Sequence, residues 1–142
     1  MKICGIELKS NTALVAVIDT EPSSILDSAN EPEYINTKIK KFTLENDEDT
    51  NSILNFKQEL ENFLEEHKIE KVALKKRAKK GTFAGGAVTF KSEAIIQLNE
   101  VCEVSFITSQ AITKYTKANE IILPNELNKY QEQAYLSSLL LV

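Results

Sequence analysis

Histidine and cysteine are scarce in this chain, and their scarcity disfavours several kinds of site. The sequence has one histidine, His67, and two cysteines, Cys4 and Cys102, with no Cys-x-x-Cys pair. A zinc site built from His and Cys ligands therefore lacks ligands. A serine or cysteine nucleophile has only His67 as a partner, which disfavours a catalytic triad. Each cysteine lies in an alternating apolar run, so we expect buried free thiols; a disulfide between two central strands is the alternative.

Long apolar runs are also missing. No stretch approaches the roughly 20 apolar residues that a membrane-spanning helix needs, and the first apolar run is short and interrupted by Glu7. That run is typical of a strand rather than of a signal peptide. Hydrophobic residues make up 42% of the chain and charged residues 27%, as in ordinary globular proteins. We expect a single domain over residues 1–142, a cytoplasmic location and no membrane partner.

Glycine is rare too, but its few copies are clustered. Three of the four glycines lie between positions 81 and 86, directly after a basic run at residues 75–80. The basic run has five cationic side chains in six residues: Lys75, Lys76, Arg77, Lys79 and Lys80. The other 136 residues hold 12 basic and 21 acidic side chains, a net charge of −9. The sequence therefore predicts one local positive region on an acidic protein.

Three interpretations of the basic run stay open. Its lysines could bind the phosphates of nucleic acid or a small anion such as a nucleotide, with Gly85 and Gly86 letting backbone N–H groups approach the anion. It could instead be a solvated loop that balances the acidic body, and the glycines could serve a tight turn or close packing. Phe83 would stack on a base or anchor the loop in the core. The segment matches neither a Walker loop nor a GxGxxG fingerprint.

The hydrophobic pattern predicts a mixed α/β fold. Alternating apolar residues predict strands at residues 2–8, 13–20, 35–44, 70–76 and 102–107. Apolar residues at helical spacing predict helices at residues 51–67, 87–98 and 109–117 and a last helix from Pro124. We expect Thr50 or Asn51 to cap the first helix and Thr108 or Ser109 the third. The inner face of the second helix is predicted to be Ala87, Phe90, Ala94, Ile95 and Leu98, which leaves Glu93 outside. The order predicts a mixed five-stranded sheet flanked by helices.

This order of three strands, helix, strand, helix, strand and two helices is that of the ribonuclease H-like fold. The segments "MKICGIELK" and "KGTFAGGAVTFKSEAIIQL" resemble the short bacterial proteins grouped as domain of unknown function 3010, a family without an established activity. More distantly, "GIELKSNTALVAVID" is similar to the first hairpin of RuvC-type Holliday-junction resolvases. The segments "VALKKRAKKGTFAGGAVTFKSEA" and "VSFITSQAITK" resemble the fourth strand and its loop, and the fifth strand and its helix, of the same resolvases.

The RuvC-type resemblance implies a metal site and also a departure from it. Nucleases of this fold hold two divalent ions between several carboxylates, and Mg²⁺ prefers such oxygen ligands. Glu7 stands where the first of these acids is expected, and the last helix offers Glu132 and Glu126. The acid expected at the end of the fourth strand is replaced by Lys75 or Lys76, which cannot ligate a cation. We therefore expect one of these lysines to pair with Glu7 in place of a metal ion.

Three functions follow as hypotheses. The first is a ribonuclease H-like module that binds nucleic acid through Lys75–Lys80, with degraded or absent nuclease activity and no cofactor. The second is a divergent Mg²⁺-dependent nuclease that uses Glu7 and Glu132. The third is a protein-interaction or regulatory module without a polyanion ligand. The C-terminal "LSSLLLV" would pack as a helix or form a contact in a homodimer.

Overall fold

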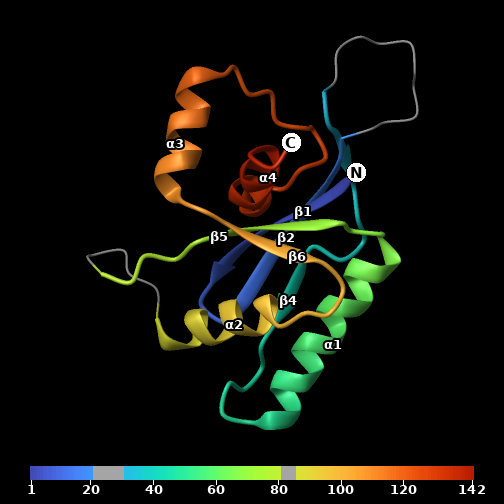
Figure 1. The fold of residues 1–142 in the computed structure, drawn as a ribbon, viewed down its shortest axis with the longest axis vertical. Helices are drawn as coiled ribbons and strands as arrows, with labels where there is room; N and C mark the ends of the chain where they lie inside the picture. Colours follow the sequence, from blue (N-terminus) through green and yellow to red (C-terminus); the bar gives the residue numbers. More distant parts are fainter. Residues whose placement is uncertain (21–30, 81–85) are drawn as a thin grey trace.

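The structure, a computed structural model of the chain, describes residues 1–20, 31–80 and 86–142 (Figure 1). Within these residues six strands form one sheet: β1 (Lys2–Lys9), β2 (Thr12–Asp19), β3 (Glu33–Ile35), β4 (Lys41–Thr43), β5 (Lys71–Lys75) and β6 (Glu103–Ile107). The helices are α1 (Thr50–Glu66), α2 (Ala87–Gln97), α3 (Ser109–Ala118) and α4 (Glu132–Leu139), with a 3₁₀ turn, η1 (Lys129–Gln131), before α4.

The sheet is mixed, as the sequence predicts. Its strands lie in the order β3-β2-β1-β5-β6, and β4 also pairs with β2. β1 and β2 form an antiparallel hairpin, whereas β5 runs parallel to β1 and β6 runs parallel to β5. The helix α1 directly precedes β5, and α2 connects β5 to β6. The fourth predicted strand is β5, and it lies beside β1, as the expected contact between Glu7 and a lysine at the end of this strand requires.

Alternation along β1 assigns its side chains to two cores. Cys4, Ile6 and Leu8 belong to the core beneath α1 and α2. Ile3 lies on the opposite face, in the core with α3 and α4. Because successive strand residues point to opposite faces, Gly5 and Glu7 share the face of Ile3. Figure 1 shows the resulting layers, with α1 and α2 below the sheet and α3 and α4 above it.

Two strand predictions need correction. The single strand expected at residues 35–44 is divided into β3 and β4, so the sheet has six strands rather than five. Between them the Thr37 hydroxyl donates to the Ile39 carbonyl at 2.6 Å, and the Lys40 ammonium donates to the Thr37 carbonyl at 2.6 Å. These local bonds hold a bend where a straight strand was expected. The third strand also begins earlier than predicted, because Glu33 already belongs to β3. Residues 21–30, between the second and third predicted strands, lie outside the described part.

The predicted helix boundaries and faces are partly wrong. α1 is capped by Asp49, whose carboxylate accepts the Asn51 N–H at 3.1 Å, not by Thr50 or Asn51. Thr108 caps α3 as predicted, since its hydroxyl accepts the Ala111 N–H at 3.1 Å.

The inner face of α2 was also predicted incorrectly. Thr89, Ser92 and Glu93 are buried there, whereas Leu98 is 67% exposed. Ile95 is buried as expected. The last helix begins at Glu132 rather than at Pro124, because Asn128 and Gln131 form a capping box that starts η1.

Buried polar and thiol groups complete the cores. Cys4 and Cys102 are free thiols, buried and half-buried, and burial raises the pKa of Cys102 to about 11. Glu61 of α1 accepts the Glu100 N–H at 2.8 Å and pairs with Lys57 at 3.1 Å. The backbone bond, reinforced by Lys57, holds the pKa of the Glu61 carboxyl below its usual value. None of the helices in the described ranges is long and apolar enough to cross a membrane.

Candidate functional site

The site is positioned by a close contact between α4 and β1. A Cβ atom built on Gly5 would lie 1.7 Å from the carbonyl oxygen of Ala134, so only glycine lets α4 approach this closely. Ala134 itself is fully buried. Glu7 lies two residues after Gly5, on the same face of β1. Gln133 directly precedes Ala134 in α4. The contact therefore brings the first turn of α4 over the carboxylate of β1.

Glu7, Lys75 and Gln133 form a polar cluster at this point. β1 and β5 are in register with Ile6 opposite Leu74, so Glu7 and Lys75 follow side by side on the face of α4. The Lys75 Nζ atom lies 3.4 Å from Glu7 Oε2 and donates to Gln133 Oε1 at 2.8 Å. The Glu7 side chain is 5% exposed and that of Lys75 is 16% exposed. The predicted lysine–carboxylate contact is present, and Lys75, not Lys76, makes it.

The cluster borders a hollow of about 510 Å³ at the carboxyl end of β1. Its lining consists of Glu7, Lys9, Lys129, Tyr130, Glu132 and Gln133. Glu132 thus shares a hollow with Glu7, as the resemblance to resolvases implies. Glu126 is exposed in the segment before η1 and does not line this hollow. The hollow therefore contains the carboxylates of Glu7 and Glu132 together with Lys9 and Lys129. The Lys75 ammonium contacts Glu7 as well.

These residues do not fit a magnesium ion. Across residues 1–20, 31–80 and 86–142, no group of three or more His, Cys, Asp or Glu side chains could hold a metal. The Lys75 ammonium already contacts the Glu7 carboxylate, and it would repel a divalent cation at the same oxygen. The positive charge that a metal would bring to Glu7 is supplied by the protein itself.

The basic run leaves the sheet beside this cluster. The Lys76 N–H donates to the Ile107 carbonyl at 2.8 Å, which extends the β5–β6 pairing by one residue. The side chains of Lys76, Lys79 and Lys80 are exposed, whereas Arg77 is half-buried. β5 and β6 are parallel, so the basic run and the start of α3 emerge at the same edge of the sheet.

Glu93 anchors the base of the basic run. Its side chain accepts the backbone N–H of Arg77 at 3.3 Å, and the residue is only 8% exposed. The Nε atom of Arg77 is buried and has no hydrogen-bond partner within the part of the chain that the structure describes. The expectation that Glu93 faces outward from α2 is wrong, because it links α2 to the segment after β5.

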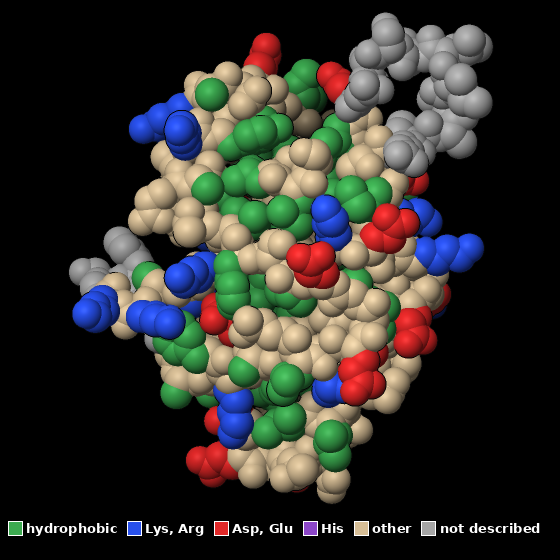
Figure 2. Space-filling view, viewed as in Figure 1, with side chains coloured by type: hydrophobic (Ala, Val, Ile, Leu, Met, Phe, Trp, Pro, Cys, Tyr) green, Lys and Arg blue, Asp and Glu red, His purple; other side chains and the backbone are tan. Residues whose placement is uncertain are grey.

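A second hollow, of about 550 Å³, lies between the basic run and the start of α3. Its lining consists of Lys76, Arg77, Ala78, Lys79, Lys80, Thr108, Ser109 and Gln110. We call this the run hollow. In Figure 2 its blue side chains gather at the left edge of the molecule, beside the segment drawn in grey. The five cationic residues of the basic run therefore fall into two groups. Lys75 contacts Glu7, and the other four residues line the run hollow.

The glycines after the basic run are only partly described. Gly85 and Phe83 lie outside the described residues. Gly86 precedes α2 with φ −78° and ψ 170°, a conformation that any residue adopts. A Cβ atom on Gly86 would meet nothing within 4 Å. Neither close packing nor a left-handed backbone therefore requires glycine at this position.

Three residues at this end of the molecule were not identified from the sequence. Gln133 was not singled out, although its position next to Glu132 on the predicted last helix would have placed it near Glu7. Lys114 and Lys117 of α3 were not considered either, although they line a further hollow next to the run hollow. Their spacing with Gln110 and Thr113 on one helical face was a signal in the sequence.

Several solved structures are similar to this fold over nearly its whole length. The RuvC structure from Thermus thermophilus has a TM-score of 0.69 at 10% identity and covers 98% of this chain and 92% of its own. The yeast mitochondrial Holliday junction resolvase has a TM-score of 0.53 at 11% identity, with coverages of 97% and 74%. The fowlpox virus resolvase in complex with Holliday junction DNA has a TM-score of 0.51 at 16% identity, with coverages of 97% and 91%.

These likenesses establish the ribonuclease H-like fold of RuvC-type resolvases, as the order of elements predicts. The chain belongs to the family described as "Protein of unknown function (DUF3010)", which matches residues 1–140. The family resemblance seen in the sequence is thereby confirmed. Among curated proteins, none has a sequence that matches this chain.

Proposed function

We propose that this protein is a nucleic-acid-binding module that contacts phosphates through the basic run and has lost metal-dependent strand cleavage. The observation that carries the binding proposal is the lining of the run hollow. Four cationic side chains line it, and no acidic residue does among the described residues. In a chain with a formal net charge of −4, such a surface selects an anion.

The fold makes nucleic acid the first anion to consider. Two of the similar structures are resolvases in complex with Holliday junction substrate or DNA. The run hollow also lies at the carboxyl ends of the parallel strands β5 and β6, where open α/β sheets usually bind ligands. A four-way DNA junction is therefore the first probe, with duplex and single-stranded DNA and RNA beside it.

Lys75 supports the loss of metal-dependent cleavage. A two-metal mechanism needs carboxylates that converge on both ions. Here the carboxylate of Glu7 is held by an ammonium at 3.4 Å, and that ammonium is held in turn by Gln133. Glu132 remains, but one further carboxylate across the hollow does not replace the acid expected on β5. Binding would therefore proceed without a divalent ion.

Fluorescence anisotropy with the labelled junction, in EDTA and at increasing KCl, tests this proposal. We expect tight binding at low salt, with the logarithm of the association constant falling linearly as the logarithm of the salt concentration rises. Lys79→Ala/Lys80→Ala should reduce this slope by about 1.8, because about 0.9 is lost for each phosphate contact. Lys38→Ala/Lys41→Ala is the matched control, since both lysines are exposed and lie toward the opposite edge of the sheet.

The alternatives appear as distinct outcomes. If none of the DNA and RNA probes binds at low salt, the binding proposal is wrong and a protein-interaction module is favoured. If the junction is cut when Mg²⁺ or Mn²⁺ is added, and Glu7→Gln abolishes the cutting, the protein is a divergent nuclease. Equal slopes for the basic-run variant and its control would remove the basic run from the binding surface.

A further inference from the structure

The outer face of α3 continues the positive surface beyond the basic run. Gln110, Thr113, Lys114 and Lys117 follow one another at the spacing of a single helical face. The opposite face carries Ile112, which is 4% exposed and packs in the core beneath α3. α3 contains no acidic residue. Its amphipathic pattern therefore leaves the two lysines in solvent.

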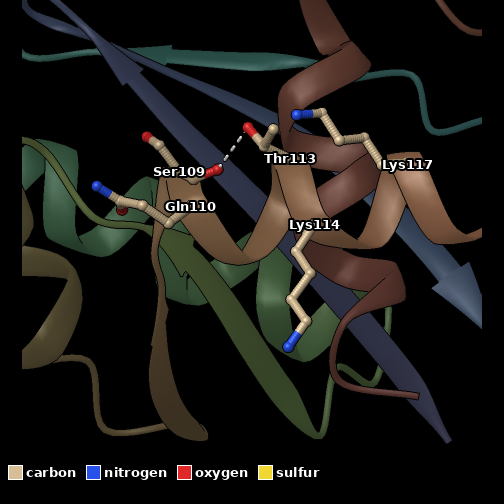
Figure 3. Close-up of a pocket in the computed structure, with 5 residues that line it drawn as sticks. All are labelled: Ser109, Gln110, Thr113, Lys114 and Lys117. Carbon is tan, nitrogen blue, oxygen red and sulfur yellow. Dashed lines mark hydrogen bonds between the residues drawn. The ribbon is translucent and has the colours of Figure 1, made fainter.

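The lysines of α3 border a hollow that adjoins the run hollow. This α3 hollow has a volume of about 550 Å³ and is lined by Ser109, Gln110, Thr113, Lys114 and Lys117 (Figure 3). Ser109 and Gln110 line both hollows, so the two hollows adjoin at the start of α3. In Figure 2 a second group of blue side chains lies above the first, over α3. We call the combined surface the phosphate track.

The charge of the phosphate track is of one sign. Six cationic side chains line it and, among the described lining residues, no acidic one does: Lys76, Arg77, Lys79, Lys80, Lys114 and Lys117. The four ion pairs found within residues 1–20, 31–80 and 86–142 involve none of these six. Unpaired cations in a row are available to an anionic ligand with several charges.

The phosphate track is long enough to contact several phosphates of one ligand. From Gln110 to Lys117 the helix rises about 10 Å, since each residue of an α-helix adds about 1.5 Å. The run hollow extends this length beyond the first turn of α3. A single phosphate or a mononucleotide would contact one hollow and leave the lysines of the other unused. A nucleic-acid backbone would reach both.

The described lining suits contact with the sugar-phosphate backbone, which a duplex presents on its outer surface. Proteins that bind single strands combine a positive groove with aromatic side chains on which bases stack. No aromatic residue is among the described residues that line either hollow. Lysine, serine, threonine and glutamine side chains contact phosphates and sugars and carry no base-stacking surface.

We propose that α3, through Lys114 and Lys117, extends the basic run into a track for the phosphate backbone of a nucleic-acid duplex, bound without regard to base sequence. This inference rests on the proposed function and adds to it the second half of the binding surface and the form of the ligand. Duplex arms are also part of a four-way junction, so the track is compatible with that probe.

The test compares salt slopes for a short labelled DNA duplex in EDTA. The variants are Lys114→Ala/Lys117→Ala, Lys79→Ala/Lys80→Ala and the control Lys38→Ala/Lys41→Ala. We expect the α3 variant to lower the slope by about 1.8, like the basic-run variant, because each double variant removes two phosphate contacts. The control should keep the wild-type slope. Two duplexes of unrelated sequence should bind equally, and a single strand of the same length should bind more weakly.

The outcomes separate this inference from the proposed function. If the wild type binds and the basic-run variant weakens binding while the α3 variant matches the control, the proposed function stands and the α3 track is wrong. If the wild type binds no nucleic acid, both fail. Tighter binding of the single strand than of the duplex overturns the assignment to a duplex. Circular dichroism and the urea midpoint of each variant should match the wild type, so that a change of slope reports lost contacts and not lost folding.

Discussion

Removing the charge of Lys75 should destabilise the protein more than removing the charge of Glu7. At 3.4 Å, and with an effective dielectric constant of about 20, the attraction between the two charges is about 5 kcal/mol before desolvation is counted. Lys75→Met would leave the buried Glu7 carboxylate, whose side chain is 5% exposed, without its counter-charge. Breaking a buried pair in this way costs about 3 kcal/mol of the free energy of unfolding. In Glu7→Gln the more exposed ammonium can turn toward water, so we expect a loss of about 1 kcal/mol.

The double variant Glu7→Gln/Lys75→Met isolates the pair. It leaves no buried charge, so its free energy of unfolding should lie within about 1 kcal/mol of the wild-type value. The coupling between the two sites is then about 3 kcal/mol, which urea denaturation followed by circular dichroism resolves for each of the four proteins. Additive losses in the double variant, or a Lys75→Met variant as stable as the wild type, would refute a buried ion pair at this site.

Three further predictions concern the surroundings of the site. Gly5→Ala should cost about 3 kcal/mol of the free energy of unfolding, measured with urea, since its Cβ would meet the Ala134 carbonyl oxygen; an unchanged midpoint contradicts this contact. The Glu61 carboxyl has a lowered pKa in the folded state, so its stabilisation is complete above its usual pKa of about 4.3 and disappears as the pH falls through the folded value. Glu61→Gln should therefore lower the melting temperature at neutral pH and flatten its fall in acid; a parallel acid profile contradicts this. Lys75→Glu should give a melting temperature that rises with added Mg²⁺, whereas the wild type should not respond; a response of the wild type alone contradicts the role given to Lys75.

The cluster could be predicted because the sequence resembles the ribonuclease H-like fold of RuvC-type resolvases, and the hydrophobic pattern alone would not have placed it. Apolar alternation identified β1 and β5, and the resemblance implied that these two strands lie side by side. A carboxylate in one strand and lysines at the end of its neighbour then had to lie close together. Alignment could not choose between Lys75 and Lys76, because a shift of one residue moves a side chain to the other face of the sheet. The register, with Ile6 opposite Leu74, makes that choice.

The hydrophobic pattern of the sequence could not predict which face of α2 is buried. Ile95 and Ile96 are adjacent, so the apolar residues of this helix fit more than one stripe. The structure buries Glu93, whose carboxylate is satisfied by the Arg77 N–H in a different segment. Burial of a carboxylate depends on such a partner, and the partner is known only once the tertiary fold is known.

The close contact between α4 and β1 could not be predicted from the sequence either. Gly5 is one glycine in an apolar strand, and nothing beside it in the sequence identifies the Ala134 carbonyl as its neighbour. The start of the helix, in contrast, had a local signal. Asn128 and Gln131 have the spacing of a capping box, and that pair, rather than Pro124, predicts where η1 begins.

Binding of a labelled four-way DNA junction in EDTA, measured by anisotropy over a range of KCl concentrations, is the decisive test of whether this protein binds nucleic acid without a metal ion. We expect binding at low salt without any divalent ion, and an association constant that falls steeply as salt is added, because several lysines contact phosphates. Absence of binding at low salt, or binding that appears only with Mg²⁺, would contradict it.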